Sequence, residues 1–154
     1  MTAHKDLVYR VAWSGDGRTI ASAGKDNLIW LWDVEQRRYR TALSGHTAFI
    51  RALAATPDGK SIVSGGEDST LRVWDIASGA CTRIMYGYGL SVHVASWSPD
   101  GRYVTSFGSD ALITLYDLQG ETPERILTGL LTAGNTDAQK ITLRQLGAVE
   151  QASF

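Results

Sequence analysis

Short apolar runs separated by turn signals follow one another along most of the chain. In its middle, the small-residue run 61–66 is followed by a turn, and then by 71–75, where apolar and polar residues alternate. Alternation with a period of two is typical of a strand with one buried face. Asp-Gly pairs between such runs are typical of hairpin turns. The pattern therefore predicts consecutive antiparallel strands.

The same landmarks recur at intervals of 42 residues. They are the turn residues Asp16, Asp58 and Asp100, the later turn residues Asp26, Asp68 and Asp110, and the strand-end pairs Trp32-Asp33, Trp74-Asp75 and Tyr116-Asp117. A fixed period of this length indicates a repeat architecture in which every copy is one supersecondary unit. We expect three copies, at about 4–45, 46–87 and 88–129, within a region 1–129.

Each copy is predicted to hold four antiparallel strands. In copy one these are 7–13, 19–23, 28–34 and a polar fourth strand near 38–43. The fourth strand of copy two is expected near 81–85 and that of copy three at 124–127. The register stops after Gly129, since a fourth copy needs Asp-Gly at 142 and 143, where the chain has Thr142-Leu143. Residues 130–154 are therefore predicted to be a tail, with either a strand at 140–146 or a short helix at 142–151.

The 42-residue pattern, with Gly-His opening copy two at Gly45-His46 and Trp-Asp closing its third strand, resembles the WD-repeat family of β-propellers. The resemblance covers residues 4–129. It implies an all-β fold, a partial WD-repeat β-propeller of three four-stranded antiparallel blades. Propellers use 4–8 blades, so the ring is expected to be completed by another copy or another chain.

The resemblance also implies a hydrogen-bonded relay in each copy, formed by His of Gly-His, a strand Ser, a turn Asp and the Trp of Trp-Asp. Such a network fixes geometry when every member is satisfied. Ser, His and Asp also compose a hydrolase triad, but recurrence in successive copies and the added Trp favour a structural role. The relay residues are His4, Ser22, Asp26 and Trp32 in copy one, and His46, Ser64, Asp68 and Trp74 in copy two.

Copy three departs from this pattern. Tyr88 replaces the His and Tyr116 replaces the Trp, whereas Ser106 and Asp110 remain. The relay there is expected to be incomplete and blade three the least rigid. The phenol of Tyr116 could still donate a hydrogen bond.

The family resemblance places a partner-binding face at the turns before the first and third strands. Tyr and Arg are residue types that are enriched at interface hot spots. The side chains at these positions differ from copy to copy, while the repeated residues around them stay the same. The positions implied are Leu7, Phe49 and Ser91, then Tyr9, Arg51 and His93, then Lys25, Glu67 and Ser109.

Composition narrows the function classes. The formal net charge of −1 gives no general attraction to nucleic acid or membrane. The basic cluster 37–40 lies on a predicted outer strand, where charges face solvent and blunt an edge, so it is not expected to bind nucleic acid. A single cysteine, Cys81, and an N-terminus without an apolar signal core predict a cytoplasmic location. The Asp-Gly turns offer too few oxygens for calcium, and no cofactor or metal is expected.

Three blades form an arc with two open ends. Each end would expose about half a dozen apolar side chains, at about 1.5–3 kcal/mol each, a cost comparable to the net stability of a domain. We therefore expect either self-association of two chains into a six-bladed ring or completion by another chain.

The resulting hypothesis is a non-catalytic scaffold that presents a turn-lined face to a protein or peptide. The alternative is a fragment or a regulatory or sensor segment of a larger multidomain WD-repeat protein. An enzyme is the least favoured class, since the candidate unique to one copy, His93, has no Asp, Glu or Cys in its own strand.

Overall fold

The computed structural model describes residues 3–86, 91–109, 113–119 and the strand 124–128. This part of the chain contains twelve strands and no helix. The strands are β1 (Val8–Trp13), β2 (Thr19–Gly24), β3 (Ile29–Asp33), β4 (Arg38–Leu43), β5 (Ile50–Ala55), β6 (Ser61–Gly66), β7 (Thr70–Asp75), β8 (Cys81–Tyr86), β9 (Val92–Trp97), β10 (Tyr103–Gly108), β11 (Ile113–Asp117) and β12 (Glu124–Thr128).

The strands form three four-stranded antiparallel sheets in chain order, β1–β4, β5–β8 and β9–β12. We call them blades one, two and three. The structure confirms the predicted all-β fold of three antiparallel four-stranded blades. The predicted tail, with its alternative strand and helix, lies outside the described residues.

The Asp-Gly turns close the first hairpin of each blade. In blade one, the Ser14 hydroxyl and the Arg18 N–H both donate to Asp16 Oδ1, at 2.6 and 3.0 Å. These bonds lower the pKa of Asp16. Gly17 follows with φ of 70°, a conformation that a glycine adopts without steric cost. Thr56 and Asp58 repeat the side-chain contact at 2.6 Å in blade two.

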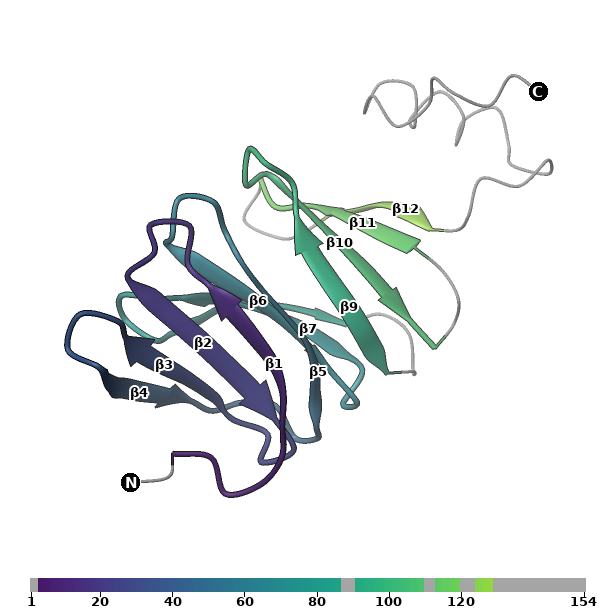
Figure 1. Ribbon diagram of the computed structural model, residues 1–154. Coiled ribbons are helices and arrows are strands. Elements are labelled where there is room, and N and C mark those ends of the chain that lie inside the picture. Colours follow the sequence, from purple (N-terminus) through teal and green to yellow (C-terminus); the bar gives the residue numbers. More distant parts are fainter. Residues whose placement is uncertain (1–2, 87–90, 110–112, 120–123, 129–154) are drawn as a thin grey trace, which may run out of the picture.

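The blades stack face to face, with the first strands β1, β5 and β9 adjacent (Figure 1). Two apolar cores result. Blade one supplies small and branched residues such as Ala21 and Leu31 to the first core, and blade two supplies Ile50 and Ile62. The second core joins the opposite face of blade two, including Val63, to blade three. Blade two is therefore covered on both faces.

Arginines on the outer strands also join neighbouring blades. The guanidinium of Arg40 on β4 donates to the carbonyl of Ile76 in blade two. Arg83 on β8 donates to the carbonyl of Leu118 in blade three, at 3.4 Å. The two acceptors lie 42 residues apart and so occupy equivalent positions in blades two and three. In each case the arginine donor comes from the preceding blade.

The two outer faces of the stack stay open in the described chain. On blade one, Val11 and Trp13 are exposed, and on blade three Val94 and Phe107 are exposed. The described strands therefore form an arc with an apolar sheet surface at each end, because apolar residues that face inward in the central blade face solvent in the terminal ones.

Candidate functional site

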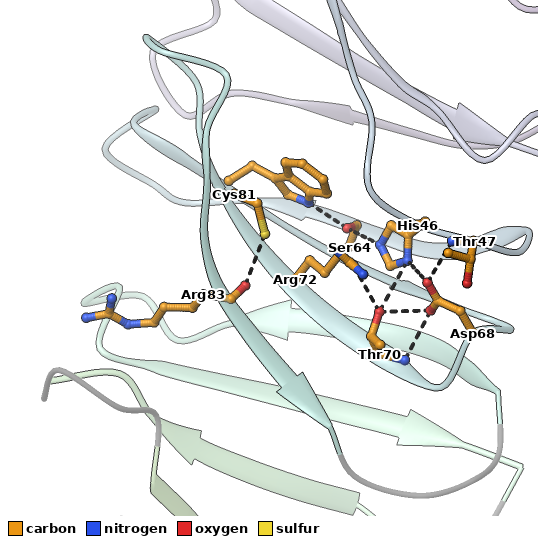
Figure 2. Close-up of polar contacts among 9 residues, drawn as sticks. His46, Thr47, Ser64, Asp68, Thr70, Arg72, Cys81 and Arg83 are labelled. Carbon is orange, nitrogen blue, oxygen red and sulfur yellow. Dashed lines mark hydrogen bonds and ion pairs between the residues drawn. The ribbon is translucent and has the colours of Figure 1, made fainter.

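The relay of blade two joins its strands through buried side chains (Figure 2). Trp74 Nε1 donates to Ser64 Oγ at 2.8 Å, and Ser64 Oγ lies 2.7 Å from His46 Nε2. His46 Nδ1 lies 2.8 Å from Asp68 Oδ2. The same carboxylate accepts the N–H groups of Thr47 and Thr70, each at 3.1 Å. The four implied relay residues of this blade are thus joined in one series of contacts, from Trp74 through Ser64 and His46 to Asp68.

One proton arrangement satisfies all these groups. Since Trp74 donates to Ser64, the Ser64 hydroxyl donates to His46 Nε2, and His46 Nδ1–H then donates to Asp68. Burial lowers the pKa of His46, against the attraction of Asp68. Burial also acts to raise the pKa of Asp68, but His46 and the Thr47 N–H hold it below its usual value. A neutral imidazole beside a carboxylate is therefore the resting state.

Blade one repeats these contacts with nearly the same distances. His4 Nδ1 lies 2.9 Å from Asp26, His4 Nε2 lies 2.7 Å from Ser22, and Trp32 Nε1 donates to Ser22 at 2.7 Å. The difference is access to solvent. Trp74 is buried, whereas Trp32 is half-buried and borders a hollow on the open face of blade one.

Blade three retains part of the implied set. Ser106 and Tyr116 are both buried, and Tyr116 packs within the core between blades two and three. The other two positions of this copy, Tyr88 and Asp110, lie outside the described residues.

The Ser-His-Asp geometry of the relay does not make blade two a hydrolase. The Ser64 side chain is fully buried, at 0% exposure, and its oxygen accepts a hydrogen bond from Trp74. A nucleophile must reach its substrate, and no surface opens onto this oxygen. Since the same bonds recur in blade one, the relay acts as a brace between strands.

The implied partner-binding face contains a connected cluster across blades one and two. Tyr9 and Phe49 pack with ring centroids 6.4 Å apart. The Arg51 guanidinium lies 4.1 Å from the centre of the Tyr9 ring and 5.8 Å from that of Phe49. Lys25 Nζ lies 5.6 Å from the Phe49 ring centre. Arg51 also forms an ion pair with Glu67 at 2.7 Å. We call these five residues the aromatic-cation cluster.

The equivalent positions of blade three form a different pair. His93 Nε2 lies 2.7 Å from Ser109 Oγ, and the Ser109 N–H donates to the carbonyl of Ser91 at 3.0 Å. Arg51 and Glu67 occupy the corresponding places in blade two, with the same separation of 16 residues. Leu7 is exposed, and its carbonyl accepts the Lys25 N–H. The backbone framework of this face is therefore constant, while its side chains differ from blade to blade.

Sequence reasoning missed what the basic cluster 37–40 does. The Arg40 guanidinium donates to the Ile76 carbonyl of blade two, and Arg38 Nε donates to the Gln36 side-chain oxygen at 2.7 Å. Tyr39 packs edge-on against Trp30, with centroids 5.2 Å apart. These contacts make the cluster part of the blade framework. The signal in the sequence was the position of Arg40 on an outer strand, one blade before the carbonyl that it reaches.

Neither a metal-ligand group nor a membrane-spanning helix is found in the described residues. Among them, no group of three His, Cys, Asp or Glu side chains could hold a metal ion. Within the same part of the chain, no helix is long and apolar enough to cross a membrane.

Comparison with known sequences identifies the family. The profile of the WD40 family, described as WD domain, G-beta repeat, matches residues 1–33, 37–75 and 79–117. These three matches cover most of the chain and follow the three blades. The chain belongs to the WD40 repeat family, whose members generally bind other proteins.

Individual relatives match over shorter stretches. The chain is 38% identical over 56 residues to the anaphase-promoting complex subunit cdc20 of Dictyostelium discoideum, covering 34% of this chain and 11% of that protein. It is 34% identical over 53 residues to the B-type cell cycle switch protein ccs52B of Medicago truncatula, covering 34% and 11%. It is 48% identical over 46 residues to the U3 snoRNP-associated protein-like YAOH of Oryza sativa subsp. japonica, covering 30% and 9%. The chain thus matches about a tenth of the length of each.

Proposed function

We propose that this chain is a non-catalytic scaffold that binds a protein or peptide through the face carrying the aromatic-cation cluster. The observation that carries the proposal is the packing of Arg51 between the Tyr9 ring and the Glu67 carboxylate, on a rigid blade framework. Aromatic and arginine side chains dominate the energetics of many interfaces.

The cluster is held in place before any partner arrives. The Glu67 N–H donates to the Phe49 carbonyl at 2.9 Å, which fixes the two segments that present Phe49 and Glu67. Arg51 sits on β5, whose neighbouring residues Ile50 and Ala52 are buried in the two cores. Side chains that are already ordered lose less entropy on binding, so a preformed face favours affinity.

Completion of the arc is the second part of the proposal. The exposed apolar residues at both ends favour a covering blade, supplied either by a second copy in a six-bladed ring or by another chain. Solution mass separates the two, because a ring of two copies has twice the chain mass of 16.7 kDa. A stable monomer of 16.7 kDa excludes the two-copy ring and leaves another chain as the source of the covering blade. A chain that forms neither a two-copy ring nor a complex with any captured protein would contradict the need for completion.

Partner capture tests the face. Phe49→Ala combined with Arg51→Ala removes both anchors from the half-buried cluster and should abolish recovery of proteins that the unchanged chain captures from a cell lysate. Thr82→Ala combined with Ile84→Ala, on the exposed side of outer strand β8, is the matched control and should retain them. Equal recovery by both double variants would refute the assignment of this face.

The alternative is that these blades are a regulatory or sensor part of a larger WD-repeat protein. Its support is that the matched relatives are about ten times longer than the matched stretch. We propose a cytoplasmic location for either form. Detecting the native protein by immunoblot distinguishes them, since a band near 16.7 kDa favours the short scaffold and a much larger band the multidomain protein.

A further inference from the structure

The two internal blade interfaces share a close approach at the end of the second strand. Gly65 on β6 faces Val92 of blade three, and a Cβ built on Gly65 would lie 2.6 Å from Val92 Cγ1. The equivalent residue of blade one is Ala23, which is fully buried in the core that also holds Ile50, the counterpart of Val92. Both interfaces therefore require a very small residue at this place.

Blade three carries Phe107 at the same place, 42 residues after Gly65. Its backbone pairing is equivalent, since Phe107 pairs with Val94 as Gly65 pairs with Ala52. Phe107 is 40% exposed on the open face. Val94 also replaces Ala52, which lies 3.3 Å from the Cβ position at Gly65. Two larger side chains therefore occupy the place that receives the next blade's first strand in the other interfaces.

The open face of blade one, in contrast, reproduces a face that is buried elsewhere in the chain. Val8 occupies the position of Val92, and Val8 is 46% exposed where Val92 is 2% exposed. Trp13 occupies the position of Trp97, whose Nε1 donates to the Ala54 carbonyl across the interface at 3.3 Å. The face therefore carries the valine and the tryptophan that a neighbouring blade contacts inside this molecule.

We propose that the open face of blade one binds a WD-type blade with glycine or alanine at the position of Gly65, and that Phe107 prevents a second copy of this chain from supplying it. This inference rests on the proposed completion of the arc, and it states which molecule supplies the covering blade. The occupant is a blade of another polypeptide.

Steric exclusion is the physical reason. In a head-to-tail pair of copies, Val8 of one copy would meet blade three of the other as Val92 meets blade two. A single added Cβ at Gly65 already approaches Val92 too closely, and Phe107 adds a benzyl group at that place. Forcing extra atoms into such a contact makes it unfavourable, although both surfaces are apolar.

Sedimentation velocity tests the exclusion. The unchanged chain should sediment as a species of 16.7 kDa, whereas Phe107→Ala combined with Val94→Ala should strengthen self-association by about tenfold or more. Ile113→Ala, which trims another exposed apolar residue of the same face, is the matched control and should not. Far-UV circular dichroism checks folding, and Phe107→Ser is the second variant if the first loses its strand signal.

A directional titration identifies the surface that is bound. The labelled probe carries Phe107→Ala, Val94→Ala and also Trp13→Asp, which blocks its own blade-one face. It should bind the unchanged chain at least about tenfold more tightly than a probe that carries Trp13→Asp alone, and should not bind a Trp13→Asp target.

Two results overturn the inference: equal binding by the two probes, or a stable dimer of the unchanged chain that Phe107→Ala does not strengthen. Neither result depends on Phe49 or Arg51. Equal partner capture by the Phe49→Ala, Arg51→Ala variant and its control, with probe binding as expected, therefore refutes only the proposed interaction face.

Discussion

Removing the Ser64 hydroxyl is the sharpest test of the relay. Ser64→Ala deletes one oxygen and leaves two buried groups without their partner, the Trp74 Nε1–H donor and the His46 Nε2 acceptor. Each buried unsatisfied group costs about 1–3 kcal/mol. The two costs overlap because the groups share one site, so the expected loss in free energy of unfolding is about 2–4 kcal/mol.

The matched control is Ser22→Ala, which deletes the same oxygen from the same set of bonds in blade one. Trp32 there is half-buried and lies beside a hollow of about 500 Å³, where water can replace the lost partner. Since a water-mediated bond is nearly as favourable as a direct one, the expected loss is at most about 1 kcal/mol.

Urea unfolding followed by circular dichroism measures both variants, with the midpoints converted at a common slope. The decisive quantity is the difference between them. Equal losses in the two blades would show that burial does not set the strength of the relay. A loss below about 0.5 kcal/mol for Ser64→Ala would contradict the buried brace itself.

Three further outcomes are expected. Burial lowers the pKa of His46 from 6.5, so the unfolded state takes up the proton before the folded state as the pH falls below 6.5. The melting temperature should therefore drop between pH 7 and pH 5. The drop should be smaller in His46→Gln, which has no imidazole to protonate. Gly66→Ala places a Cβ 3.2 Å from His46 Nδ1 and 2.9 Å from a backbone oxygen, and should destabilise the protein by about 1–3 kcal/mol, measured by urea unfolding; Gly101→Asn, at an open turn position with φ of 70°, should change little. Arg40→Ala removes a bond between blades one and two and should cost about 1 kcal/mol of unfolding free energy, whereas Arg38→Ala on the same strand should not.

Much of the fold followed from spacing alone. The 42-residue period and the Asp-Gly pairs predicted all four strands of each blade, because such turns leave few ways to pair the flanking runs. Boundaries differ by a residue or two. β3 ends at Asp33, one residue before the predicted end at Val34, and the Val34 N–H donates to the Arg18 carbonyl outside the strand pairing.

The contacts between blades were harder to predict. The family resemblance implied that Tyr9 and Arg51 share one face. It did not predict the stacking of the guanidinium on the phenol ring, since that depends on how two blades approach each other. The position series Ala23, Gly65 and Phe107 was readable in the sequence. Its meaning appeared only with the short distance from Gly65 to Val92.

The central position of blade two has a consequence for amide hydrogen exchange. In a linear array of units, stability comes from each unit and from the contacts with its immediate neighbours. Amides of β6 and β7 should exchange only through global opening of the chain, while those of β2 and β3 also exchange when blade one detaches alone. A bound blade on the open side of β1 would erase that difference, so deuterium uptake at Trp32 relative to Trp74 would report occupancy of the end without any label on the partner.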